Sequence, residues 1–286
     1  MTFTSTHSTY DPTLFAGVAK YYSQYRPRYN NELYQLLIEE FQLDGTGRLL
    51  DLATGTGLIA IALSNQFTEV IGLDPDPEML REAQQEVELA NIHNIQWINS
   101  QAENLSAQLG EFRLITIGRA YHWFDKPKVL QLASDRLIQG GGIAITYSHQ
   151  DIWHSTESWK IAVLEVVKKY LGAKRRVGNG TIENLDATYA ELPRLLEQSG
   201  FTTPLLKTII IDKTWTIDSW VGYLYSTAFC RPDYFGDRLN AFEQEMRETL
   251  ATLFPSGEFT EQIPFDVYIA HKNYSASRSN PDKGNP

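Results

Sequence analysis

The sequence predicts an α/β fold with a doubly wound, mostly parallel sheet and a helical cap. Three observations support this prediction. Short apolar runs alternate with helical patterns along the first half of the chain, and the first run leads directly into a glycine-bearing turn at residues 53–57. A second apolar run, at 70–73, ends on an acid, Asp74. In open α/β sheets, ligands bind at the carboxyl ends of the strands, where these residues would lie.

Strands are expected wherever an apolar run lies between turn residues. The predicted strands are at 48–52, 70–73, 95–99, 114–118 and 143–147, with later ones at 205–211 and 265–270. A helix is expected after Asp76, a favourable N-cap, with Pro77 in the first turn, where its missing N–H costs nothing. The glycine run 140–142 is expected to end another helix before the fifth strand.

Composition excludes several classes of protein. A formal net charge of −10 argues against tight binding to nucleic acid, whose phosphates need clustered Lys and Arg. A single cysteine, Cys230, excludes an intramolecular disulfide and a cysteine-based metal site, and no metal is expected. No apolar run reaches the ~20 residues of a membrane span, and the first residues do not resemble a signal peptide. We therefore expect a soluble, cytoplasmic protein whose oligomeric state stays open.

The glycine turn predicts a nucleoside-binding site. Glycine lets backbone N–H groups and a helix N-terminus approach a ligand closely, and Asp74 is placed to accept both hydroxyls of a ribose. Residues 55–60 also satisfy the relaxed dinucleotide fingerprint, which is a weak match by itself. Asp51 stands where dinucleotide folds usually keep an apolar residue, and dense polar loops follow at 100–105 and 118–125. These features favour a different nucleoside-based cofactor.

Successive segments of the chain resemble the class I S-adenosylmethionine-dependent methyltransferases. The segments are residues 51–57, Asp74, the loop 101–103, the block 121–124 and the N-terminal stretch 15–29. Small-molecule enzymes similar to trans-aconitate methyltransferase look most alike. The resemblance covers 15–147 well and the C-terminal half only loosely. It implies a Rossmann-like fold and S-adenosyl-L-methionine as cofactor.

The resemblance also implies roles for individual residues. Those expected to bind the cofactor are Asp51, Ala53, Gly55, Gly57, Asp74, Pro75, Ala102 and Glu103, together with Tyr25 and Arg26 of the N-terminal segment. Arg119 and His122 would face the methyl group as catalytic residues. Two departures from the family pattern are present: Ala53-Thr54-Gly55 replaces glycine–cysteine–glycine, and Arg119 stands where many relatives carry glutamine.

A single domain is expected because no linker interrupts the chain. Flexible tails at 1–14 and 274–286 would flank a methyltransferase domain at 15–273. Its expected parts are a lid at 15–45, a cofactor-binding half at 46–150, and helical cap segments at 151–200 and 213–254. Arg175 and Arg176 are assigned to a mobile surface loop, with attraction of an anionic substrate as the alternative. The aromatic residues between 215 and 235 are divided between the core and a pocket wall.

The predicted function is methyl transfer to a small-molecule acceptor, with O-methylation of a carboxylate as the first hypothesis. Arg119 suits bidentate binding of a carboxylate, which needs no base. A hydroxyl or amine acceptor would need one, and His122 is the candidate, because the ordinary pKa of histidine is about 6.5. Two alternatives remain: an NAD(P)-dependent oxidoreductase that uses the same turn, and a binding protein without catalysis.

Overall fold

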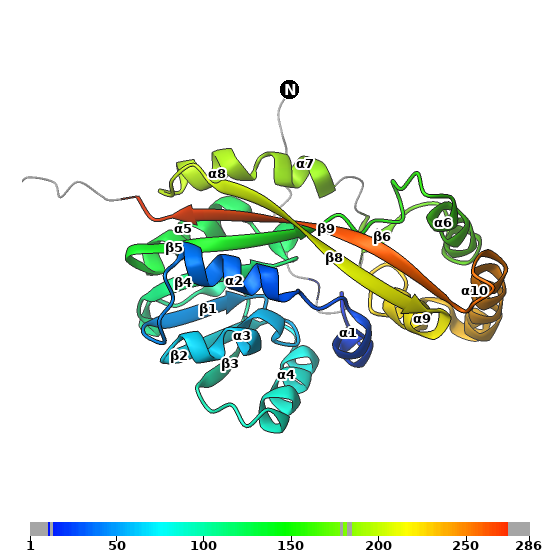
Figure 1. Cartoon of the computed structure of the whole chain (residues 1–286), viewed down its shortest axis with the longest axis horizontal. Coiled ribbons are helices and arrows are strands. Elements are labelled where there is room, and N and C mark those ends of the chain that lie inside the picture. The colour runs from blue at the N-terminus through cyan, green and yellow to red at the C-terminus, as the bar shows by residue number, and fades with distance from the viewer. Residues whose placement is uncertain (1–10, 12–13, 178–179, 182–184, 274–286) are drawn as a thin grey trace, which may run out of the picture.

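A computed structural model of the protein describes residues 11, 14–177, 180–181 and 185–273 (Figure 1). Within them, a seven-stranded sheet runs in the order β3-β2-β1-β4-β5-β9-β8. The strands are β1 (Arg48–Leu52), β2 (Glu69–Asp74), β3 (Ile95–Asn99), β4 (Phe112–Gly118), β5 (Leu137–Ser148), β8 (Leu205–Thr216) and β9 (Glu258–His271). The first five in the spatial order are parallel, whereas β9 is antiparallel to both β5 and β8. The predicted doubly wound, mostly parallel sheet is confirmed.

Strands β2, β4, β5, β8 and β9 are longer than predicted, and two of these extensions replace an expected helical boundary. The glycine run 140–142 lies inside β5 instead of ending a helix, because the preceding helix stops at Arg136 and Gly142 pairs with His271 of β9. Residues 213–216 continue β8 and do not begin a helical segment. The expected tail at 274–286 and nearly all of that at 1–14 lie outside the described residues, although Leu14 is described and is buried.

The described residues form ten α-helices, several of which cover the two faces of the sheet (Figure 1). They are α1 (Ala19–Tyr25), α2 (Asn31–Glu40), α3 (Leu58–Ala62), α4 (Pro77–Leu89), α5 (Lys126–Arg136), α6 (Ser158–Leu171), α7 (Leu185–Ala190), α8 (Leu192–Gln198), α9 (Ile217–Tyr225) and α10 (Leu239–Leu253). Successive strand residues point to opposite faces. Leu49 of β1 belongs to the core beneath α2 and α3, whereas Leu50 belongs to the core beneath α5 and α8.

The expected cap segment 151–200 divides between two places. Helix α6 packs on α10 and α9 at the far ends of β8 and β9 (Figure 1), whereas α8 packs on α5. Leu192 and Leu196 are fully buried in the same core as Leu130 of α5, so α8 belongs to a sheet face. Amphipathic spacing shows that a helix has an apolar face but does not show which surface that face covers.

The long β8–β9 ribbon carries the cap beyond the sheet. Figure 1 shows α6, α9 and α10 gathered at its end, beside α1. Helix α1 packs against both α9 of the cap and α4 of the cofactor-binding half. Trp215 and Trp220 lie in the buried interior of the cap, where their rings meet edge to face. The N-terminal segment therefore joins the cap to the sheet.

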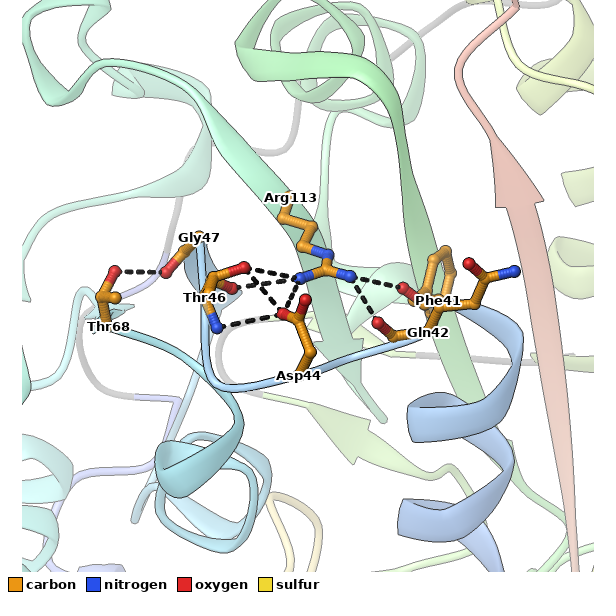
Figure 2. Close-up of polar contacts among 7 residues, drawn as sticks. All are labelled: Phe41, Gln42, Asp44, Thr46, Gly47, Thr68 and Arg113. Atoms are coloured by element: carbon orange, nitrogen blue, oxygen red, sulfur yellow. Dashed lines mark hydrogen bonds and ion pairs between the residues drawn. The ribbon is translucent and has the colours of Figure 1, made fainter.

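An arginine network lies at the amino ends of β1 and β4 (Figure 2). One guanidinium nitrogen of Arg113 donates to the carbonyl oxygens of Phe41 (3.3 Å) and Gln42, just beyond α2. The other donates to Thr46 Oγ1 (3.1 Å) and pairs with Asp44. This network connects the α2–β1 loop to β4 at the amino ends of the strands, opposite the carboxyl ends.

None of the helices in the described ranges is both long and apolar enough to traverse a bilayer.

Candidate functional site

A pocket lies over the glycine turn at the carboxyl ends of β1, β2 and β4. We call it the turn pocket. Its empty space, which includes volume open to solvent, is about 780 Å³. Six of the ten residues predicted to bind the cofactor line it: Ala53, Gly55, Asp74, Pro75, Ala102 and Glu103. Sequence reasoning missed Leu14, Phe15 and Tyr22 of the N-terminal segment, which close the pocket from the other side.

The turn backbone offers space for a closely bound ligand. Gly55 has a φ of +55°, and a Cβ added there would have one neighbour within 4 Å, Tyr22 Cε1 at 3.9 Å. The side-chain position of Gly55 is thus open toward the pocket. Ala53 also adopts a left-handed φ, +51°, which strains a residue that carries a Cβ. The turn thus combines a strained backbone at Ala53 with a glycine that leaves room for a closely bound ligand.

Asp74 lies at the tip of β2 and lines the turn pocket. Its carboxylate accepts the backbone N–H of Gly55 at 2.8 Å and that of Asp76 at 2.9 Å. Burial is the largest influence on this carboxyl and raises its pKa to about 7. A carboxylate oxygen accepts more than one hydrogen bond, so Asp74 retains capacity for the hydroxyls of a ribose.

Two predicted cofactor residues lie behind the turn. Asp51 is buried, and its oxygens accept the hydroxyls of Thr54 (2.6 Å) and Thr116 (2.7 Å). Burial raises the pKa of Asp51 to about 6. Gly57 caps α3 and faces Trp97. The structure does not bring Asp51 or Gly57 to the lining of the turn pocket; their contacts shape the turn itself.

The phase of helix α1 decides which lid residues reach the site. Tyr25 stacks on Tyr21 and packs against Gly222 of α9, so it lies away from the turn pocket. Tyr22 and Arg26, also one turn apart, lie on the adjacent face of the helix, and the Arg26 guanidinium lies 4.8 Å from the Tyr22 ring centre. Tyr22 lines both the turn pocket and the neighbouring one, whereas Arg26 lines only the neighbouring one.

That neighbouring pocket, the arginine pocket, opens between the sheet and the cap and has an empty space of about 850 Å³. It shares Phe15, Tyr22, Arg119 and Trp123 with the turn pocket. The two pockets therefore meet at these four side chains. Methyl donor and methyl acceptor need such an arrangement, since the reacting atoms must come into contact.

Three arginines converge on the arginine pocket: Arg26, Arg119 and Arg175. Each has a buried Nε that lacks a hydrogen-bond partner within the described part of the chain. A buried donor without a partner is costly, which suggests a missing acceptor. Asp151 is the pocket's carboxylate, and its Oδ1 lies 3.4 Å from Arg175 Nη1. The pocket is therefore positively charged.

Each arginine is held by a different part of the fold. Arg119 follows β4 with a left-handed φ of +55° and donates from Nη1 to the carbonyl of Pro27 at 3.2 Å. Arg26 donates to the carbonyl of Ser226, beyond α9, at 3.1 Å. Burial lowers the pKa of Arg26, and the charges of Arg119 and Arg175 lower it further.

His122 lines the arginine pocket, and its Nδ1 lies 3.3 Å from the hydroxyl of Tyr189. Burial lowers its pKa to about 3, with the charges of Arg175, Lys126 and Arg26 acting in the same direction. The ring is therefore neutral near pH 7 and is a weak base. This environment does not favour His122 as a general base.

Of the two readings of Arg175, the structure does not support a merely exposed surface loop, because it places this side chain on the wall of the arginine pocket. The aromatic residues between 215 and 235 divide as expected. Tyr223 and Phe229 line the arginine pocket, whereas Trp215 and Trp220 are fully buried. Arg176 has no described side chain.

Comparison with known proteins finds similarity to methyltransferases. A family profile described as "Methyltransferase domain" matches residues 49–141. The chain is 26% identical over 212 residues to a protein of Dictyostelium discoideum named as a methyltransferase, covering 74% of this chain and 75% of that one. It is 29% identical over 129 residues to CRG1 of Saccharomyces cerevisiae, named as an S-adenosylmethionine-dependent methyltransferase, covering 44% of each.

The fold has close counterparts among solved structures. One of them, named as a type II methyltransferase from Anaeromyxobacter dehalogenans, superposes with a TM-score of 0.57 at 17% identity. The superposition covers 87% of this chain and 97% of that one. At this identity the likeness concerns the fold.

Proposed function

The chain is an S-adenosylmethionine-dependent methyltransferase with the class I fold, and we propose that it methylates a carboxylate oxygen of a small polyanionic acid. The observation that carries the proposal is the set of three arginines with unpartnered Nε donors in a pocket that adjoins the turn pocket. This acceptor class also agrees with the resemblance to enzymes similar to trans-aconitate methyltransferase.

In this proposal the turn pocket holds the cofactor. Gly55 leaves room for close approach, Asp74 binds the ribose hydroxyls, and Ala102 and Glu103 border the adenine. We expect Asp74→Ala to weaken S-adenosylhomocysteine binding about 100-fold, since two hydrogen bonds to a charged group are lost. Calorimetry measures this, with the exposed Asp135→Asn as control. NADH is expected to give no binding heat, which would separate the cofactor from a dinucleotide.

The charge of the arginine pocket argues for an anion with more than one carboxylate. Arg26, Arg119 and Arg175 contribute three positive charges, against one carboxylate from Asp151. Guanidinium groups bind carboxylates in a bidentate manner. Arg119 borders both pockets and would hold the carboxylate that is methylated, whereas Arg175 lines only the arginine pocket and would hold a second one. The net charge of −10 speaks against a nucleic-acid acceptor.

S-adenosylmethionine supplies an activated methyl group on a positively charged sulfur. The chain contributes alignment, which can lower a barrier by roughly 7–11 kcal/mol. Tyr22, Phe15 and Trp123 line the boundary of the two pockets and would exclude water there. Transfer joins the methyl carbon to a carboxylate oxygen while the sulfur–methyl bond breaks. The positive charge on the sulfur and the negative charge on the carboxylate are thereby neutralised. A dry site favours such a change.

No side chain has to remove a proton in this reaction, because a carboxylate is already ionised at neutral pH. The lowered pKa of His122, about 3, fits an acceptor that needs no base. A neutral His122, held near Tyr189, would serve as a wall of the arginine pocket.

A screen of small acids tests the proposal. The chain is incubated with S-adenosylmethionine and mono-, di- or tricarboxylic acids, and S-adenosylhomocysteine and the methyl ester are quantified. We expect turnover with di- or tricarboxylic acids, and a loss of kcat/KM of about 10–100-fold in Arg175→Gln, the cost of one charge-assisted contact. Arg194→Gln, on the exposed side of α8, is the matched control.

Two results would refute the proposed acceptor. One is an Arg119→Ala variant that retains full activity toward every acid that the wild-type chain methylates. The other is turnover with amines or phenols and none with acids.

A further inference from the structure

We propose that Gln150 selects acceptor acids that carry a hydroxyl group, by presenting its amide oxygen to the arginine pocket. The inference rests on the proposed function and names the kind of acid. Gln150 follows β5 and lines the pocket with Arg26, Arg119 and Arg175. Its side chain is partly buried.

The orientation of the Gln150 amide follows from its partner. Gln150 Nε2 lies 2.9 Å from Glu261 Oε2 of β9. An ionised carboxylate only accepts hydrogen bonds, so the amide nitrogen has to face Glu261. The amide oxygen then points away from Glu261, and no described residue donates a hydrogen bond to it.

Glu261 is itself fixed, so the amide has a rigid anchor. The Glu261 side chain is 2% exposed, and Lys160 Nζ of α6 lies 2.7 Å from its Oε1. Trp215 Nε1 donates to the same Oε2 that binds Gln150, at 2.9 Å. With Lys160 and Trp215 holding Glu261, turning the amide over would place two oxygens against each other.

The amide oxygen complements a pocket rich in donors. Asp151 is the other side chain with a carboxylate or amide oxygen among the described lining residues, and its oxygens are already engaged. Oδ1 accepts the N–H of Trp153 at 2.9 Å and lies near Arg175, while Oδ2 lies 2.8 Å from His154 Nδ1. Of the carboxylate and amide oxygens on the described lining residues, the Gln150 oxygen is the one to which no described residue donates, and a hydroxyl on a bound acid can donate to it.

Two pairs of acids that differ by one hydroxyl test the inference: succinate with malate, and tricarballylate with citrate. Their affinities for the chain saturated with S-adenosylhomocysteine are measured by calorimetry, and their kcat/KM with S-adenosylmethionine by ester formation. We expect the hydroxylated member of a pair to be preferred about tenfold, the contribution of one hydrogen bond. In Gln150→Met, which keeps the side-chain length without the amide, the ratio should fall to about one.

Gln244→Met is the matched control. Gln244 is exposed on α10 and donates from Nε2 to Glu248 Oε1 at 2.9 Å, away from the arginine pocket, so the preference for the hydroxylated acid should persist in this variant. Gln150→Leu repeats the test with a second apolar side chain. Equal use of both members by the wild type, a preference that survives in Gln150→Met, or binding of neither acid overturns the inference. Hydroxyl-selective binding without ester formation would refute the proposed function and support the role of Gln150.

Discussion

Gly57 faces the indole of Trp97 so closely that a Cβ at position 57 would lie 2.8 Å from Trp97 Cη2. This added Cβ would also lie 3.0 Å from Ile61 Cδ1, and the φ of Gly57 is +81°. We expect Gly57→Ala to lower the free energy of unfolding by about 2–3 kcal/mol, because overpacking adds to left-handed strain. Urea denaturation measures this. A loss below about 0.5 kcal/mol would show that Trp97 moves aside freely.

Gly55→Ala should behave differently, because its new Cβ would point into the open turn pocket. We expect a stability loss of about 1 kcal/mol from the left-handed φ alone. Affinity for S-adenosylhomocysteine should fall more than tenfold, since the methyl group occupies the space over the turn. Calorimetry and urea denaturation on Gly55→Ala and Gly57→Ala together separate the two effects. Unchanged affinity in Gly55→Ala would contradict a ligand bound closely over the turn.

Arg113 is expected to stabilise the amino ends of β1 and β4 (Figure 2). These ends lie opposite the carboxyl ends, where the pockets are. Arg113→Ala leaves the carbonyls of Phe41 and Gln42 without their guanidinium donor, and we expect a loss of roughly 2 kcal/mol in the free energy of unfolding. Asp44→Ala should cost less, since Arg113 keeps its bonds to the carbonyls and to Thr46. Binding of S-adenosylhomocysteine should be unchanged in both variants. Equal losses of stability in Arg113→Ala and Asp44→Ala would show that the ion pair between these two residues accounts for the whole effect.

The free energy of unfolding should fall as the pH rises from about 4 to 6. Burial raises the pKa of Asp51 to about 6, so in this window the folded chain retains a proton that the unfolded chain releases. The contribution is fully present below the unfolded pKa and is lost as the pH rises through the folded one, at up to ~1.4 kcal/mol per pH unit. Subtracting the Asp51→Asn profile isolates this slope. If the stability of the wild type and that of Asp51→Asn changed in parallel with pH, the raised pKa of the Asp51 carboxyl would be contradicted.

The shared wall of the two pockets predicts coupled binding. A positive cofactor beside Arg119 is repelled until an anion enters, whereas the neutral sulfide of S-adenosylhomocysteine is not. We expect succinate to raise the affinity for an amine analogue of S-adenosylmethionine several-fold more than that for S-adenosylhomocysteine. Arg119→Gln should reduce the difference. Calorimetry with sodium chloride at equal ionic strength is the control, and equal responses to both salts would contradict the coupling.

The cofactor-binding half could be predicted because its signals are local. Apolar runs between polar turns define β1 and β3 to the residue, and Asp74 is the last residue of β2. The glycine turn is likewise encoded within a few positions, since left-handed backbone requires particular residues. Chemistry and secondary structure lie close together in this part of the sequence.

The acceptor side depends on packing between distant segments. Arg175 stands in a polar stretch typical of a surface loop and reaches the pocket wall beside Phe229 of the cap, with its guanidinium carbon 5.2 Å from that ring centre. For Tyr25 and Tyr22, the spacing predicts a stripe, but the choice of face depends on where α9 and Gly222 lie. Such tertiary contacts leave no periodic trace in a single sequence.

Arg119 borders both pockets, whereas Arg175 borders one. Engineering or natural drift at position 119 therefore acts on two ligands at once, and a gain for a new acid can be offset by weaker retention of the methyl donor. Position 175 is free of that conflict. We expect laboratory evolution of new acceptor ranges to begin at Arg175 and to reach Arg119 last.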